Sequence, residues 1–139
     1  MNIRLAAESD NPDLREVYLE SRRNRFYWAV TENMKLDDFD RDTVDEVILL
    51  AEEDSRVAGF VSLYLPDNFI HHLFVHPDFF GKGAGVRLLQ AAIHKMHTPV
   101  TLKCVSKNHK AMKFYEKNGW QKVVEESGAG EPYWIMRYE

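Results

Sequence analysis

The sequence contains very little cysteine, since Cys104 is the only one among 139 residues. One cysteine cannot form an internal disulfide, so core packing must stabilise the fold, and we expect a reducing, cytoplasmic environment. Long apolar runs are missing as well, because none approaches the roughly 20 residues that cross a bilayer. The N-terminus lacks the charged-then-apolar pattern of a signal peptide. We therefore expect no membrane-spanning segment and no membrane partner.

An excess of positive charge is also absent. The 18 lysines and arginines are outnumbered by 22 acidic residues, which gives a net charge of -4. A nucleic acid is therefore not an expected partner, because domains that bind one usually carry a basic surface. Internal repeats and low-complexity tracts are missing too. The length leaves room for one ordinary core, and we predict a single domain over residues 1–139.

What the sequence does contain is a strand, a glycine-rich turn and a helix between residues 69 and 96. Apolar residues over 69–75 predict the strand, and Pro77 ends it because proline cannot donate to a sheet ladder. Glycine then occupies every second position of the turn, at Gly81, Gly83 and Gly85. Apolar residues next recur at three- and four-residue steps, at Val86, Leu89, Ile93 and Met96, with Ala92 beside them. This spacing predicts an amphipathic helix over residues 84–97.

The glycine-rich turn predicts a site for a pyrophosphate. Glycine lets the backbone approach a ligand closely and adopt positive φ, and the helix N-terminus offers unpaired N–H groups that favour an anion. Lys82 adds a positive charge. A Walker loop would need Ser or Thr in place of Gly83, and a dinucleotide fingerprint would need glycine in place of Val86. The alternative is a tight turn that binds no ligand.

Two segments resemble the GNAT superfamily of N-acyltransferases. The run Leu73-Phe-Val-His-Pro-Asp-Phe-Phe-Gly-Lys-Gly-Ala-Gly is similar to its acyl-CoA-binding motif, Gln/Arg-x-x-Gly-x-Gly/Ala after a strand that ends near Val-x-Pro. Gly83 and Gly85 match the two small positions, whereas Phe80 stands where the family has Gln or Arg. The run from Asn108 to Trp120 is similar to the family's Asn-x-x-Ala-x-x-Phe-Tyr-x-x-x-Gly-Phe. The resemblance covers residues from about 46 to the end and is weak over 6–45.

The resemblance implies an α/β fold with a mixed, mostly antiparallel sheet, helices on both faces and two central parallel strands that splay apart. The pattern along the chain agrees with this order. Strands are expected over 1–5, 47–51, 57–65, 69–75, 99–105, 120–125 and 133–138. Helices are expected over 10–23, 36–42 and 84–97, and between Asn108 as the cap and Gly119 as the C′ residue.

The resemblance also implies a reaction, the direct transfer of an acetyl group from acetyl-CoA to a primary amine of a small molecule or peptide, without a metal. Backbone amides of Leu73 and Val75 would hold the pantetheine and the acyl oxygen, and Asn108 would contact the cofactor as well as cap its helix. The turn would hold the diphosphate through Phe80, Gly81, Lys82, Gly83, Ala84 and Gly85. The alternative is a non-catalytic acyl-CoA sensor of the same fold, which Phe80 favours and the retained Tyr115 disfavours.

Acylation needs a neutral amine, yet a lysine-like amine has a pKa of about 10.4, so a base or a water chain must remove a proton. His71 and His72 are consecutive, and on a regular strand they point to opposite faces, so one of them is the candidate base. Glu46 is another acid near the sheet, expected at a turn or the surface, as are Glu52 and Glu53. Tyr115 matches the tyrosine of the family's Phe-Tyr pair and is the candidate general acid, with core packing as the alternative.

The remaining chemistry-bearing residues are assigned lesser roles. Aromatic side chains are expected to form two walls of the substrate site, at Phe26, Tyr27 and Trp28 and at Tyr133 and Trp134. Cys104 alternates with Leu102 on a strand and is expected to be a buried apolar residue rather than a nucleophile. His94 and His97 lack a third metal ligand at a suitable spacing and are expected on a solvated face. The sequence does not fix the oligomeric state, and a homodimer is one state that it allows.

Overall fold

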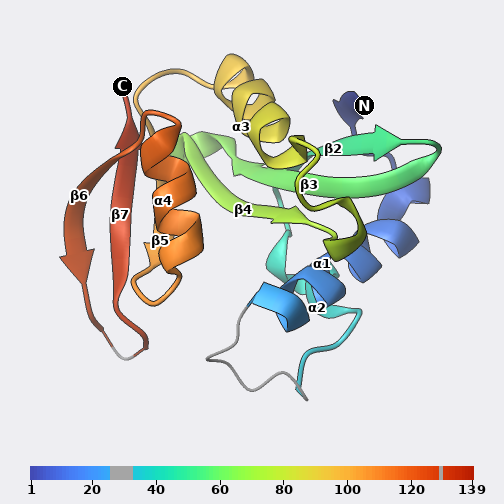
Figure 1. The fold of residues 1–139 in the computed structure, drawn as a ribbon, viewed down its shortest axis with the longest axis horizontal. Coiled ribbons are helices and arrows are strands. Elements are labelled where there is room, and N and C mark those ends of the chain that lie inside the picture. The colour runs from blue at the N-terminus through green and yellow to red at the C-terminus, as the bar shows by residue number, and fades with distance from the viewer. Residues whose placement is uncertain (26–32, 129) are drawn as a thin grey trace.

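The structure is a computed structural model that describes residues 1–25, 33–128 and 130–139. In these residues seven strands form one mixed sheet in the order β1-β2-β3-β4-β5-β7-β6, and helices lie on both of its faces (Figure 1). The strands are Asn2–Leu5 (β1), Val47–Glu53 (β2), Arg56–Tyr64 (β3), Phe69–Val75 (β4), Val100–Val105 (β5), Gln121–Glu126 (β6) and Tyr133–Tyr138 (β7). The helices are Asn11–Arg25 (α1), Asp38–Asp42 (α2), Ala84–Lys95 (α3) and His109–Lys117 (α4). The expected α/β architecture is confirmed.

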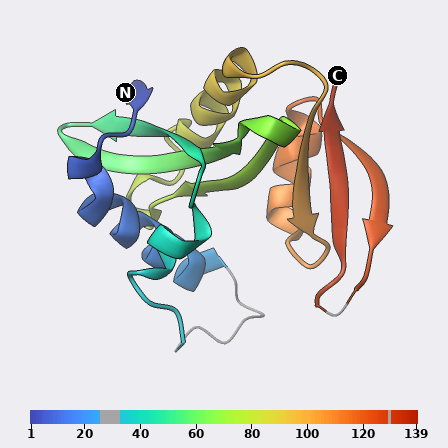
Figure 2. The ribbon, with the colours of Figure 1, turned by 180° about the vertical axis from the view of Figure 1, so that it is seen from behind.

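The central strands β4 and β5 run parallel, whereas the other neighbouring strands run antiparallel. Among the described residues β4 and β5 pair only at Phe69 with Thr101 and at Ile70 with Leu102. Beyond these pairs the two strands separate, as seen from the front and from behind (Figures 1 and 2). The expected splayed strand pair is confirmed, and it divides the sheet into two halves with a gap in the hydrogen-bond ladder.

One face of the sheet is covered by α3, whose side chains pack on β2 and β3. The buried residues of this helix are Ala84, Leu88, Leu89 and Ala92, and Met96 directly after it is buried as well. The expected face was therefore partly wrong, because Leu88 belongs to it and Val86 and Ile93 are only half-buried. A helix that packs on a flat sheet buries a stripe wider than a single row of side chains, and these two residues lie at its edges.

The opposite face is covered by α1 and α2. Leu14, Val17 and Tyr18 of α1 form a second core cluster with Phe60 of β3 and Phe39 of α2. Leu14, Val17 and Tyr18 are part of the inward face that α1 presents to the sheet. No helix in the described ranges combines the length and the apolar character that crossing a membrane requires.

The start of α1 is fixed by an ion pair. Arg4 on β1 reaches Asp10 with an Nη1–Oδ2 distance of 2.8 Å, and Asp10 also accepts a 2.7 Å hydrogen bond from the backbone N–H of Ala7. These hydrogen bonds favour the carboxylate and lower the pKa of Asp10 to about 2. The pair therefore attaches the first helix to the edge strand of the sheet.

Candidate active site

A cavity of about 820 Å³ lies where β4 and β5 separate. Its walls come from β4, from the turn into α3, from the end of β5, from α4, from the start of β7 and from α1. Eight of the nine residues expected to bind the cofactor line it: Leu73, Val75, Phe80, Gly81, Gly83, Ala84, Gly85 and Asn108. The structure therefore brings together in one cavity two sequence motifs that lie more than 20 residues apart.

The glycine-rich turn presents an open cradle to this cavity. Gly81 and Gly83 have φ values of 78° and 81°, in the left-handed region that side chains other than glycine rarely adopt. Apart from the glycine itself and its two chain neighbours, no described residue has a heavy atom within 4 Å of the place where a Cβ would sit at either glycine. The helix α3 begins directly after Gly83, which has no side chain to cap the first-turn N–H groups. This combination of open space and unpaired donors fits a diphosphate.

Lys82 does not share this orientation. Its Nζ lies 4.0 Å from Oε2 of Glu53 and 5.4 Å from the centroid of the Phe79 ring. It is not among the described residues that line the cavity. The charge that the sequence assigned to the diphosphate therefore faces Glu53, at the end of β2.

Gly85 serves packing rather than the turn. A Cβ at this position would lie 3.3 Å from Cζ of Phe114 on α4, tighter than most contacts of this kind. The missing side chain thus allows α3 to approach α4 beside the cavity. Asn108 positions α4 itself, since its Oδ1 accepts a 3.2 Å hydrogen bond from the backbone N–H of Ala111. The expected cap is confirmed.

Tyr115 is packed in the core, as the alternative interpretation expected, and it also lines the cavity. It is 9% exposed and belongs to the main core cluster, with its ring 6.0 Å from that of Trp120. It also lines the cavity, on the wall opposite β4. Core packing therefore holds its ring in place while one edge remains accessible to a molecule in the cavity.

The two histidines lie on the same side of β4, so the expectation that they point to opposite faces is wrong. Ser62 of β3 faces His72 and Leu63 faces Ile70, which leaves His71 as an extra residue in β4. Such a β-bulge interrupts the alternation of side chains between the two faces. The imidazole rings lie 3.8 Å apart between centroids, and both line the cavity.

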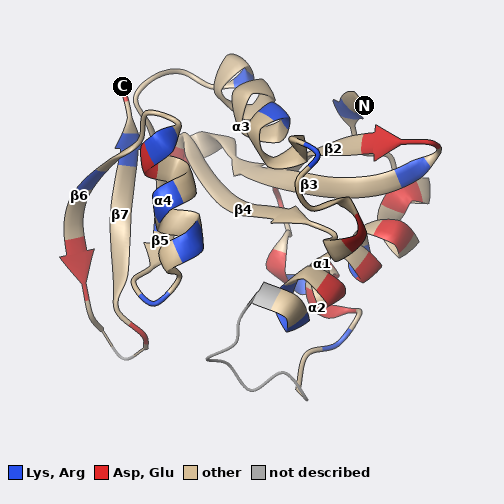
Figure 3. Cartoon of the chain, in the orientation of Figure 1, with Lys and Arg blue, Asp and Glu red and all other residues tan. Residues whose placement is uncertain are grey.

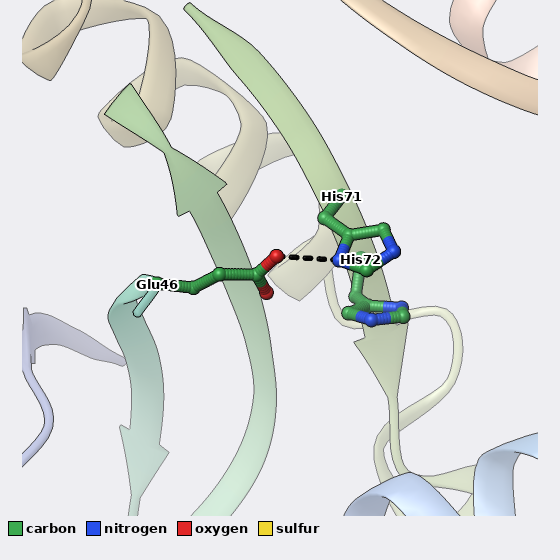
Figure 4. A group of neighbouring side chains, drawn as sticks. All are labelled: Glu46, His71 and His72. Carbon is green, nitrogen blue, oxygen red and sulfur yellow. Dashed lines mark hydrogen bonds and ion pairs between the residues drawn. The ribbon is translucent and has the colours of Figure 1, made fainter. Parts of the chain in front are cut away.

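His71 contacts an acid that the sequence placed at the surface (Figure 4). Its Nδ1 lies 2.5 Å from Oε2 of Glu46, the residue that precedes β2. The side chain of Glu46 is only 6% exposed, so its expected surface placement is wrong. The strand register brings it to His71: Val47 pairs with Leu63, which pairs with Ile70, so Glu46 lies one residue before the level of the bulge in β4. This register is a property of the folded sheet, and no local pattern in the sequence indicates it.

His72 is held differently. Its Nε2 lies 3.2 Å from the backbone carbonyl oxygen of Asp42. The centroid of its ring lies 5.3 Å from the centroid of the Tyr18 ring. Burial and the neighbouring His71 lower the pKa of His72 to about 4, so its imidazole is neutral near pH 7. The Tyr18 hydroxyl donates a 2.7 Å hydrogen bond to Asp42, and burial and this carboxylate raise the tyrosine pKa well above its usual value. The contacts with Tyr18 of α1 and with Asp42 at the end of α2 thus fix the position of the His72 ring.

The group formed by Glu46, His71 and His72 also has the composition of a metal site, with its ligand atoms within 4.8 Å of one another. Two ligands at zinc distances of 2.0 to 2.1 Å and a tetrahedral angle would be about 3.3 Å apart. The contact between His71 and Glu46 is 2.5 Å, which is the length of a hydrogen bond. The observed geometry therefore favours a hydrogen-bonded pair.

The other candidates are placed as follows. Cys104 is buried beside the cavity, as expected, and burial raises its thiol pKa to about 11. His94 and His97 are exposed. Tyr133 lines the cavity, whereas Trp134 packs against the core cluster. The wall expected at Phe26, Tyr27 and Trp28 lies outside the described residues.

The comparisons with known proteins agree with this geometry. The model of the Acetyltransferase (GNAT) family matches residues 6–120. The uncharacterised N-acetyltransferase YhfO of Bacillus subtilis (strain 168) is 32% identical, over 87% of this chain and 90% of that protein. The peptidyl-lysine N-acetyltransferase YiaC of Escherichia coli (strain K12) is 29% identical, over 98% and 95%. The PaiA N-acetyltransferase of Thermoplasma acidophilum, solved in complex with coenzyme A, superposes with a TM-score of 0.80 at 23% identity, covering 100% of this chain and 99% of that one. The chain therefore belongs to the GNAT family of acetyltransferases, which transfer the acetyl group of acetyl-CoA to amines.

Proposed function

We propose that this protein acetylates a primary amine of a small molecule or a peptide, by direct transfer within a complex that holds both substrates. The observation that carries the proposal is the single cavity that joins the glycine-rich turn, Tyr115 and the two histidines. Direct transfer is favoured over an acyl-enzyme because the one thiol at the cavity, Cys104, has its pKa raised to about 11 and stays protonated near pH 7.

The donor end of the cavity is assigned to acetyl-CoA, which supplies an activated acetyl thioester. The backbone N–H groups of Ala84 and Gly85 would bind the diphosphate at the start of α3. The amides of Leu73 and Val75, on the edge of β4 that β5 leaves, would hold the pantetheine and the acyl oxygen. Asn108 and Lys110 line the same end, and α4 is rich in lysine (Figure 3).

The acceptor end is assigned to an ammonium-bearing substrate. His71 and His72 line it, and both contact the segment 37–46. That segment is rich in acidic side chains, with red colour over α2 and the residues beside it (Figure 3). Negative charge near the entrance attracts a cationic amine and raises its local concentration. The relative YiaC, named for peptidyl-lysine, is consistent with such an acceptor.

The residues of the cavity account for the proton transfers. A neutral imidazole of the pair accepts one proton from the acceptor ammonium, which gives an amine that forms the new C–N bond as the C–S bond breaks. Tyr115 donates its phenolic proton to the departing thiolate, and it regains a proton from the newly acylated nitrogen. The imidazolium then returns its proton to solvent. The overall reaction converts acetyl-CoA and an ammonium into an amide, CoA and one released proton.

The proposal is tested by incubating the protein with acetyl-CoA and a panel of amines and lysine-containing peptides, and by measuring free-thiol release. Thermal stabilisation by CoA alone is measured in parallel, because a ligand that binds the native state raises Tm increasingly as the ligand concentration rises. Thiol release that depends on the amine supports the transferase. Stabilisation by CoA without thiol release from any amine would support the sensor alternative instead.

A further inference from the structure

A buried carboxylate, that of Glu46, contacts His71 at the acceptor end of the cavity without itself lining the cavity. Glu46 is 6% exposed at its side chain, and its Oε1 accepts no hydrogen bond from any described residue. A buried carboxylate without full hydrogen bonding is destabilising, by several kcal/mol when it is ionised and unpaired. Its Oε2 contacts Nδ1 of His71 at 2.5 Å. Such an arrangement contributes less to stability than a well-packed apolar side chain of similar volume would.

The contact fixes which nitrogen of His71 carries the proton. A carboxylate only accepts, so the neutral imidazole donates its Nδ1–H to Glu46 and keeps its lone pair on Nε2. Nε2 lies on the opposite edge of the ring, turned away from Glu46 (Figure 4). The His71 side chain is 42% exposed and lines the cavity. Nε2 is therefore the nitrogen that is available to a substrate.

His72 does not have this combination. Its Nε2 faces a backbone carbonyl, which also only accepts, so that nitrogen carries the proton of the neutral ring. Its ring is enclosed by Tyr18 and Phe74 and stacked on His71. The bulge therefore places two imidazoles together but leaves only one of them with an oriented, accessible lone pair.

We propose that Glu46 is a positioning residue that makes His71, rather than His72, the general base of the acetyl transfer. This inference rests on the proposed function. Nε2 of His71 takes the proton of the acceptor ammonium, and the Nδ1–H of the resulting imidazolium remains bound to Glu46, which stabilises the positive charge. His72 supports the His71 ring by stacking. The pair of Glu46 and His71 joins the residue before β2 to the bulge of β4, and β3 lies between these two strands.

The pH dependence involves the charged groups around this ring. Glu46 faces it from the start of β2, and His72 stacks on it from β4. Arg22 of α1 and Lys103 of β5 line the same cavity, and the Arg22 guanidinium is paired with Asp38 at 3.2 Å. Glu46 is the acidic group in direct contact, so its removal should destabilise the imidazolium more than any other single change nearby.

The decisive variant is Glu46→Gln, which keeps the shape and removes the charge. We expect kcat to fall on the order of 10²-fold and the acidic limb of the pH–rate profile to move to lower pH. The KM for acetyl-CoA and the stabilisation by CoA should stay at wild-type values. The matched control is Glu52→Gln, because Glu52 lies on β2, the strand that Glu46 precedes, but pairs with Arg4, and neither of these two residues lines the cavity. It should retain the wild-type kcat and pH profile.

A double-mutant cycle tests whether Glu46 acts through His71. We expect His71→Gln alone and the Glu46→Gln/His71→Gln double variant to lose the same activity, since residues that act as a unit are not additive. In His72→Gln the acidic limb should stay at the wild-type pH. Two results would overturn the positioning role of Glu46. One is a loss of activity in the double variant equal to the product of the two single losses, and the other is an acidic limb of the pH–rate profile that stays at the wild-type pH in Glu46→Gln.

A second measurement does not depend on the stability of a variant. Nitrogen-15 NMR of the wild-type protein reads the tautomer of His71 directly, and the inference requires the proton on Nδ1. A proton on Nε2 would refute it. A wild-type protein that binds CoA but acetylates no amine would overturn the transferase and the base together, whereas turnover that ignores Glu46→Gln would overturn only the role of Glu46.

Discussion

Substitution of Gly83 separates the binding of CoA from the stability of the fold. Gly83 has a φ of 81°, and its missing Cβ faces open space in the cradle assigned to the diphosphate. Alanine at position 83 should strain the backbone but should hardly obstruct the cradle. Glutamate adds the same strain and also places a negative charge where the diphosphate would bind. We therefore expect Gly83→Ala and Gly83→Glu to be similarly stable but to differ strongly in affinity for CoA.

The magnitudes follow from simple estimates. A side chain in the left-handed region costs roughly 1–2 kcal/mol, which lowers Tm by roughly 3–10 °C in a chain of this size. Two unit charges 4 Å apart repel by about 4 kcal/mol at an effective dielectric constant of 20. Solvent screening at this exposed turn reduces that figure to about 2 kcal/mol. We therefore expect Gly83→Glu to weaken CoA binding by about 30-fold relative to Gly83→Ala.

The assay is the Kd of CoA by calorimetry together with thermal unfolding followed by circular dichroism. Gly119→Ala is the matched control, because Gly119 also has a positive φ, of 94°, but lies at the end of α4 against Tyr138. The added Cβ also comes 3.3 Å from the Tyr138 ring, so this variant should lose at least as much stability as Gly83→Ala and keep the wild-type Kd. A folded Gly83→Glu variant that binds CoA as tightly as the wild type would refute the assignment of the turn.

Three further predictions concern single side chains. Tyr115→Phe should lower kcat on the order of 10²-fold with unchanged affinity for CoA, as expected for a lost general acid, and a wild-type rate would exclude that role. Alkylation of Cys104 by iodoacetamide, followed by mass spectrometry, should be slow at pH 7 and accelerate only as the pH approaches the thiol pKa of about 11; rapid labelling at pH 7 would contradict its burial. Asp10 has its pKa lowered to about 2, so its contribution to stability is present above the unfolded value of 3.8 and is lost as the pH falls through about 2. Asp10→Asn should therefore cost about 1 kcal/mol at pH 7 and leave Tm unchanged near pH 2, and an equal cost at both pH values would show that the ion pair with Arg4 is not its source.

The donor half of the site could be predicted from the sequence because its signals are local. Gly81 and Gly83 need positive φ where the chain turns into α3, and Asn108 and Gly119 mark the two ends of α4. Each of these features depends on a few consecutive residues. The splayed strands follow from the family resemblance that the same segments carry. Lys82 is the exception within this half, because its direction depends on Glu53, a residue of the distant β2–β3 hairpin.

The acceptor half depends on contacts that the sequence does not display. Glu46 and His71 are separated by 25 residues and by an intervening strand. Glu46 follows a turn and precedes an apolar strand, a position at which an acid is usually solvated. Only the register of β2 on β3 and of β3 on β4 brings it to His71. Leu88 was missed for a related reason, since the stripe that a helix buries depends on the sheet beneath it.

The bulge shows why consecutive residues cannot be assigned to faces from their own strand alone. Alternation applies while each residue of β4 has a partner in β3, and it ends where Ser62 pairs with His72 and Leu63 with Ile70. His71 then has no partner across the ladder, and its ring lies over that of His72 instead of on the other face. A regular strand would have placed one imidazole at the cavity and sent the other to the opposite core. The bulge instead puts one ring within reach of Glu46 and the other against Tyr18, so the irregular pairing of β3 with β4 decides which nitrogen atom faces the cavity.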